Sequence, residues 1–160
     1  MGTHFYGIHL AEIHDTGFSF FAEGASIGIL EILREKNIYS GHIVDLGCGS
    51  GILAKNMADN GYTITGVDLS QDAVNIAKKN SMKHNISNRL NIYCKNWNLI
   101  NEKFDIIVCN PPYIKNKDYY NLSKEVSKYD PKLSLVSGKT GLEKFKEVSI
   151  IANKCMDNTS

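Results

Sequence analysis

The chain has 160 residues, of which 42% are hydrophobic, and 18 lysines and arginines almost balance 17 aspartates and glutamates, for a net charge of +1. This length suits one domain, and the charge balance argues against a strongly basic nucleic-acid binder and an acidic disordered tail. Neither a run of about eighteen apolar residues nor a signal peptide is found, so we expect a cytoplasmic protein without a membrane partner.

Apolar and β-branched patterns alternate along the chain between strand-like and helical spacing. Four segments are predicted strands: 42–46, 63–69, 89–94 and 104–109. Four others are predicted helices: 17–37, 52–60, 71–84 and 141–156. Gly61 suits the end of the second helix, and Ser70 suits the N-cap of the third. The polar residues 115–137 predict a loop.

Strands that alternate with helices at this spacing predict an α/β fold, with a parallel sheet of about four strands between two helical layers. We expect residues 1–160 to form a single, partial domain, with an N-terminal segment and helix over 1–40 packing on it. Right-handed crossovers place a ligand at the carboxyl ends of the strands. The four cysteines lack CxxC spacing, which predicts reduced thiols and no metal site.

A glycine cluster follows the first strand in the sequence VDLGCGSG, residues 44–51. Glycines at 47, 49 and 51 allow a tight turn against which a ligand can lie. Asp68 ends the second strand, where an acid can bind ribose hydroxyls. Dinucleotide enzymes normally show GxGxxG, whereas this spacing is GxGxG with Asp45 just before it. A carboxylate there would repel a pyrophosphate and suits an ammonium, which S-adenosylmethionine carries together with a ribose and no phosphate.

VDLGCGSG followed by GVDLS resembles motifs I and II of the class I S-adenosylmethionine-dependent methyltransferases. The resemblance implies a Rossmann-like fold and S-adenosyl-L-methionine as cofactor. It also implies the cofactor-binding residues: Asp45, Gly47, Cys48, Gly49, Gly51, Asp68, Leu69, Asn96, Trp97 and Asn110. In that family Asp68 would bind the ribose diol, Leu69 would pack on the adenine, and Asn96 stands where an Asp commonly accepts from the adenine amino group.

The family's sheet has seven strands in the order 3-2-1-4-5-7-6, and only four are found here. We therefore expect the fold to be truncated after the helix that follows the fourth strand. That strand is apolar on both faces and would be an exposed edge, which favours pairing with another chain. The expected result is a homo-oligomer built on this edge or on the helix over 141–156.

The fourth strand is followed by Asn110, Pro111, Pro112 and Tyr113, which we predict to be the catalytic group. An amide oxygen, a proline carbonyl left without a donor and an aromatic ring can enclose a planar NH2 group. NPPY resembles the signature of amino methyltransferases that act on adenine N6 in DNA, guanine N2 in RNA, or glutamine N5 in protein.

Residues 80–156 resemble the HemK-like protein-(glutamine-N5) methyltransferases, on the stretches KFDIIVCNPPYI and EVSKYDPKLSLVSGKTGLEKFKEV. This resemblance implies a peptide-chain release factor as protein partner. Residues 1–70 are instead similar to generic or small-molecule class I methyltransferases. Two alternatives stay open: a nucleic-acid amine methyltransferase, which basic and aromatic residues after NPPY would suit although the net charge does not favour it, and a non-catalytic fragment that binds cofactor or oligomerises.

Overall fold

The structure is a computed structural model that describes residues 19–156. Residues 1–18 of the predicted N-terminal segment lie outside this range. The strands are β1 (His42–Leu46), β2 (Thr63–Asp68), β3 (Leu90–Cys94) and β4 (Ile106–Cys109). The α-helices are α2 (Ser19–Glu35), α3 (Ile52–Asp59), α4 (Gln71–Lys83), α5 (Lys124–Tyr129), α6 (Lys132–Leu135) and α7 (Glu143–Cys155). Two short 3-10 helices complete the set: η1 (Trp97–Leu99) and η2 (Tyr119–Asn121).

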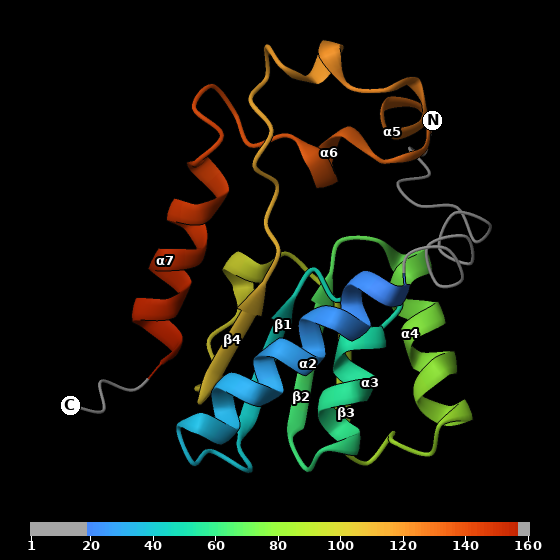
Figure 1. The fold of residues 1–160 in the computed structure, drawn as a ribbon, viewed down its shortest axis with the longest axis vertical. Helices are drawn as coiled ribbons and strands as arrows, with labels where there is room; N and C mark the ends of the chain where they lie inside the picture. Colours follow the sequence, from blue (N-terminus) through green and yellow to red (C-terminus); the bar gives the residue numbers. More distant parts are fainter. Residues whose placement is uncertain (1–18, 157–160) are drawn as a thin grey trace.

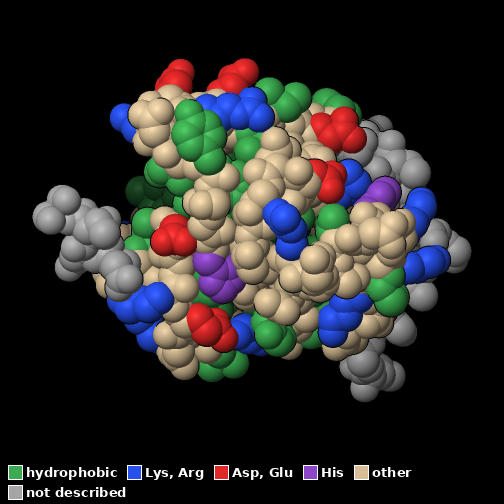
Figure 2. Space-filling view, turned by 90° about the horizontal axis from the view of Figure 1, so that it is seen from below, with side chains coloured by type: hydrophobic (Ala, Val, Ile, Leu, Met, Phe, Trp, Pro, Cys, Tyr) green, Lys and Arg blue, Asp and Glu red, His purple; other side chains and the backbone are tan. Residues whose placement is uncertain are grey.

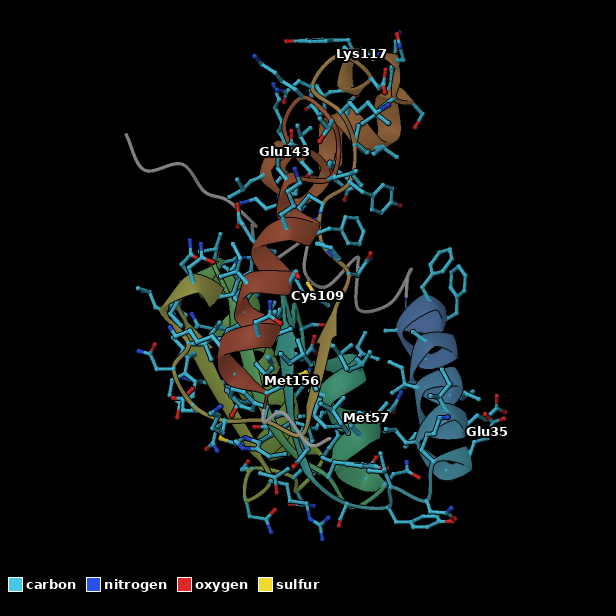
Figure 3. The ribbon with its side chains drawn as sticks, turned by 90° about the vertical axis from the view of Figure 1, so that its left-hand side faces the viewer. Glu35, Met57, Cys109, Lys117, Glu143 and Met156 are labelled. Carbon is cyan, nitrogen blue, oxygen red and sulfur yellow. The ribbon has the colours of Figure 1, made fainter. Side chains whose placement is uncertain are left out.

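The strands form one parallel sheet in the order β3-β2-β1-β4. Helices α2, α3 and α4 cover one face, and η1 and α7 cover the other, so that α2 and α7 lie on opposite sides of the sheet (Figure 1, Figure 3). This three-layer α/β arrangement confirms the predicted fold class. The first four strand positions also match the order 3-2-1-4 that the family resemblance implied.

Alternate residues of the central strand β1 enter two separate cores. Ile43 packs with Met57 and Ile64 among the helices of the first face, whereas Val44 packs with Val67 and Cys155 on the second. Ile43 and Val44 are fully buried. A strand buried on both faces shows a nearly continuous apolar run, which is why the sequence of β1 predicted its bounds without error.

Helix ends follow the local signals. The Ser70 hydroxyl accepts a hydrogen bond from the Ala73 amide at 3.2 Å and caps α4, as predicted. Gly61 has a φ of +102°, the left-handed conformation expected just after a helix. The predicted helix over 141–156 is shorter by two residues at its start, because the side chains of Thr140 and Glu143 close the turn there.

β4 lies at the edge of the sheet, as the sequence predicted, and its residues are half-buried. It begins two residues later than predicted because Phe104 leaves the ladder with β1 and bridges Met156 in parallel. The Phe104 amide donates to the Cys155 carbonyl at 2.9 Å. The end of α7 therefore pairs with the chain two residues before β4 begins.

Residues 113–138 form an upper lobe above the carboxyl ends of the strands (Figure 1). The prediction of a plain loop over 115–137 was wrong, because this segment contains η2, α5 and α6. The Ser123 hydroxyl accepts from the Val126 amide at 3.4 Å and begins α5. A parallel bridge between Ile114 and Val136 brings the two ends of the lobe together.

The opposite end of the molecule carries mixed charges. Figure 2 shows Lys and Arg side chains interspersed with Asp and Glu side chains there, with hydrophobic atoms scattered between them. Within residues 19–156, no helix combines the length and the apolar character needed to cross a membrane.

Candidate functional site

The glycine cluster turns sharply at the carboxyl end of β1. Gly47, Gly49 and Gly51 have φ values of +85°, +53° and +84°, a region that favours glycine. The amides of Gly47 and Cys48 both donate to the Val67 carbonyl, at 2.8 and 3.0 Å, which ties the turn to β2. The turn therefore presents backbone without side chains at the point where β1 and β2 end.

Asp68 is held at the end of β2 by two backbone amides. Its Oδ2 accepts from Gly49 at 3.0 Å, and its Oδ1 accepts from Ser70 at 2.8 Å. Each carboxylate oxygen has a further lone pair, so both can accept another hydrogen bond. The sequence placed this acid correctly next to the glycine turn.

A cavity of about 250 Å³ lies at the carboxyl ends of the strands. Eight of the predicted site residues line it: Gly47, Gly49, Asp68, Leu69, Asn96, Trp97, Asn110 and Pro112. Other lining residues were not predicted as site residues from the sequence, and among them four come from α6, the residue before it, and α7: Pro131, Leu133, Ser134 and Lys144. The lobe and α7 thus complete a cavity that is otherwise lined largely by residues of the predicted motifs.

Five predicted site residues do not line this cavity. Asp45, Cys48, Gly51 and Pro111 are buried, and Tyr113 is 62% exposed. Gly51 is close to α4, since a Cβ on it would lie 3.2 Å from the Ala77 Cβ. The first four therefore shape the site from behind, and the Tyr113 ring is free to meet solvent or a partner.

Asp45 is 6% exposed, and its carboxyl accepts no hydrogen bond from a described residue. Burial, and then the charge of Asp68, raise the pKa of Asp45 from 3.8 to about 7. Burial, followed by the charges of Asp45 and Asp68, also raises the pKa of the Cys48 thiol well above its ordinary value. The Cys48 thiol therefore stays protonated and unreactive, and its role is packing. The Asp45 carboxyl, in contrast, would ionise more readily if a cation came close to it.

The NPPY segment leaves the sheet and enters the lobe. Asn110 is exposed and its side-chain amide makes no hydrogen bond with a described residue, nor does any described backbone amide donate to the carbonyls of Pro111 and Pro112. Ile114 continues the segment by pairing with the returning chain, donating to the Leu135 carbonyl at 2.9 Å. The segment therefore offers several acceptors next to the cavity.

Asn96 and Trp97 form the wall on the β3 side. Asn96 Oδ1 accepts from the Asn98 amide at 2.9 Å and caps η1, which leaves one of its lone pairs available. The Trp97 indole N–H donates to Glu147 Oε2 at 3.2 Å. Glu147 on α7 was not foreseen from the sequence, because no local pattern links it to Trp97 fifty residues earlier.

Known proteins resemble this chain over most of its length. It is 37% identical to a bifunctional methyltransferase of Rickettsia bellii over 122 residues, covering 74% of this chain and 22% of that protein. It is 44% identical to a release factor glutamine methyltransferase of Buchnera aphidicola over 115 residues, covering 70% of this chain and 41% of that protein. The chain therefore spans between a fifth and about two fifths of the length of these relatives.

Structure comparison supports the same fold. The magnesium protoporphyrin IX methyltransferase of Synechocystis, solved with bound S-adenosylmethionine, matches with a TM-score of 0.55 at 16% identity, over 87% of this chain and 55% of that one. The model of the methyltransferase small domain matches residues 22–132, which include the glycine turn, Asp68 and the NPPY segment. With these motifs gathered around one cavity, the chain belongs to the methyltransferase small domain family.

Proposed function

We propose that this chain binds S-adenosyl-L-methionine in the cavity at the carboxyl ends of its strands. The observation that carries the proposal is Asp68, fixed by the Gly49 and Ser70 amides with lone pairs left for a ribose diol. The side-chain-free turn at Gly47 and Gly49 lines the same cavity. A cofactor that needs a carboxylate partner and a close backbone approach fits these residues.

The buried Asp45 and the half-buried Asp68 favour one cofactor class over the other. Asp45 and Asp68 interact strongly enough that the charge of one raises the pKa of the other. Adding a pyrophosphate would place further negative charge beside them, whereas an ammonium would relieve their repulsion. We therefore infer an aminoacyl sulfonium cofactor and not a dinucleotide.

The reaction we propose is methyl transfer to a planar amide or amine nitrogen. When bound, the cofactor supplies an electrophilic methyl group. The Asn110 side-chain oxygen and a carbonyl of the following prolines accept the two N–H groups of the acceptor, which directs its lone pair into the cavity. Alignment and electrostatic stabilisation would supply most of the rate. A strong general base is not required, because the C–S bond of the sulfonium breaks as the new N–C bond forms, leaving a neutral thioether, and the surplus N–H proton would pass to water afterwards.

The favoured acceptor is glutamine N5 of a peptide-chain release factor. This proposal is supported by the likeness to relatives named release factor glutamine methyltransferase, which are 33–44% identical over 118 and 115 residues. The Asn110 amide and proline carbonyls next to the cavity would suit a carboxamide NH2. An acceptor of this kind is planar and uncharged. Its binding therefore does not require a strong electrostatic field from this nearly neutral chain.

The test combines binding with transfer of a labelled methyl group. Asn110→Ala is expected to abolish transfer to a release factor while the Kd for the cofactor, measured by calorimetry, changes less than about threefold. Asn153→Ala is the matched control, because Asn153 is exposed on α7 and does not line the cavity. Absence of cofactor binding by the wild-type chain would refute the proposal, and binding without any transfer would favour the non-catalytic alternative.

A nucleic-acid acceptor is the second candidate, favoured by one feature of the lobe. The Lys132 ammonium lies 4.8 Å from the centre of the Tyr119 ring and 5.7 Å from that of Tyr120, and Tyr120 is highly exposed. Aromatic rings beside lysines can stack bases and contact phosphates. Label that enters an oligonucleotide and not a release factor would establish this candidate in place of the first.

Self-association through the β4 edge or α7 stays a prediction. Among residues 19–156, none pairs with the outer edge of β4, and Phe145 and Ile150 are exposed on α7. An unpaired strand edge favours pairing with a second chain. Light scattering at micromolar concentration is expected to give at least a dimer, and a strictly monomeric mass would contradict it.

A further inference from the structure

The chain's single tryptophan, Trp97, is held by two charged side chains of α7. Its indole N–H donates to Glu147 Oε2 at 3.2 Å, and Lys144 Nζ donates to both Glu147 oxygens at 2.8 and 2.9 Å. The Lys144 ammonium also lies 5.9 Å from the centre of the Trp97 ring, within the range of a cation–π contact. Each of the three side chains therefore contacts the other two.

This ion pair differs from an ordinary exposed pair on a helix. The Lys144 and Glu147 side chains are 28% and 31% exposed, and Glu147 receives three hydrogen bonds. Partial burial raises the pKa of Glu147, but the hydrogen bonds from Lys144 and Trp97 outweigh it and hold this pKa below its ordinary value. Glu147 is thus charged at neutral pH, and a charged acceptor strengthens the bond to the indole.

The contacts among Trp97, Lys144 and Glu147 lie beside the cavity. Trp97 and Lys144 both line it, whereas Glu147 lies behind them and joins η1 to α7. Trp97 also follows Asn96, the residue expected at the adenine. We propose that Lys144 and Glu147 are positioning residues that hold the Trp97 ring as a fixed wall of the cofactor cavity. This inference rests on the proposed function, since it concerns the same cofactor.

The size of the effect follows from side-chain rotamers. Without these contacts only packing against the second core would restrain the Trp97 ring, which could then occupy up to about three staggered χ1 positions. If the three are similarly populated, the ring forms the wall about one third of the time. The apparent Kd rises by the inverse of the competent fraction, so loss of the contacts should raise it roughly threefold.

Glu147→Ala removes the acceptor of the Trp97 indole N–H, whereas Lys144→Met removes the ammonium that pairs with Glu147 and lies over the Trp97 ring. Alanine favours the helical conformation, so the first variant should keep α7 folded, and circular dichroism checks this. Lys144→Arg retains a charged donor and is expected to restore the wild-type behaviour. Lys146→Met is the matched control, because Lys146 is an exposed lysine of the same helix outside the cavity lining.

Two readouts are needed. The first is Trp97 fluorescence without ligand, where both variants should show a shifted emission maximum and stronger quenching by acrylamide. The second is the Kd for S-adenosylhomocysteine by calorimetry, which should rise about threefold in both variants and stay unchanged in Lys144→Arg and Lys146→Met.

The outcomes separate this inference from the proposed function. If the wild-type chain binds S-adenosylhomocysteine and the two variants match it in Kd and in fluorescence, the positioning role is overturned while cofactor binding stands. If fluorescence changes without any change in Kd, the contacts order the ring but do not serve the cofactor, which also overturns the proposal. If the wild-type chain does not bind, the proposed function fails and this inference fails with it.

Discussion

The buried Asp45 carboxyl should make the stability of the chain fall as the pH rises towards neutrality. Burial and the charge of Asp68 raise its pKa from 3.8 to about 7. Between these values the folded chain keeps a proton that the unfolded chain releases. Its contribution to stability is therefore full below about pH 4 and is lost as the pH rises through the folded pKa.

The magnitude follows from the separation of the two pKa values. A difference of roughly three pH units, at about 1.4 kcal/mol each, gives about 4 kcal/mol in total. Most of the loss, about 3 kcal/mol, should fall between pH 5 and pH 8. Glu143 and Glu147 act in the other direction and in a lower range, because their folded pKa values are depressed and their contribution is lost only as the pH falls below about 4.5.

Urea unfolding at pH 5 and pH 8 tests this for the wild type and for Asp45→Asn, which keeps the shape of the side chain and cannot titrate. The free energy of unfolding should fall by about 3 kcal/mol more in the wild type than in the variant. Equal changes in the two proteins would refute the reasoning. A cofactor ammonium near Asp45 should also favour the ionised form, so that the Kd for S-adenosylmethionine falls as the pH rises towards 7.

Three further substitutions, one of them a control, test local packing and hydrogen bonding. Gly141→Ala should destabilise the chain by roughly 1–3 kcal/mol and reduce methyl transfer, because Gly141 has a φ of +82° and its Cβ would lie 2.6 Å from the Tyr113 carbonyl oxygen. Gly24→Ala, in an open part of α2, should leave thermal stability unchanged or raise it, and equal losses in the two variants would contradict the steric argument. Tyr62→Phe should lower the free energy of unfolding by about 1 kcal/mol, since the hydroxyl donates to the Ile38 carbonyl at 2.7 Å; an unchanged urea midpoint would show that this bond contributes nothing.

The sheet could be predicted because its signals are local. In β1 the apolar residues Ile43, Val44 and Leu46 are followed directly by the glycine cluster, and Ser70 caps the helix that it precedes. The start of β4 could not be predicted in the same way. Phe104 belongs to the same FDIIVC segment as the strand residues, yet it pairs with Met156, whose position depends on the path of the whole of α7. A contact across so many residues leaves no periodic trace in either segment.

The same difference between local and long-range signals applies to the residues of the candidate site. Asp68 and Asn110 could be identified because each stands at the carboxyl end of a strand within a recognisable motif. Leu133, Ser134 and Lys144 could not, although they line the same cavity. They reach it through the return of the lobe, a polar segment whose helices are short and whose hydrophobic spacing is irregular.

The segment from the end of the lobe to the start of α7, residues 137–144, also connects the acceptor side of the cavity to the cofactor side. Ser137 donates its amide to the Ile114 carbonyl at 2.8 Å, and its hydroxyl accepts from the Lys144 amide at 2.8 Å. Ile114 directly follows NPPY, and Lys144 begins the contacts that hold Trp97. A buried serine thus joins the segment that would hold the acceptor nitrogen to the helix that supports the cavity wall. Because both sides depend on residues 137–144, the alignment between acceptor and cofactor is set by the lobe and α7 together, and not by the sheet motifs alone.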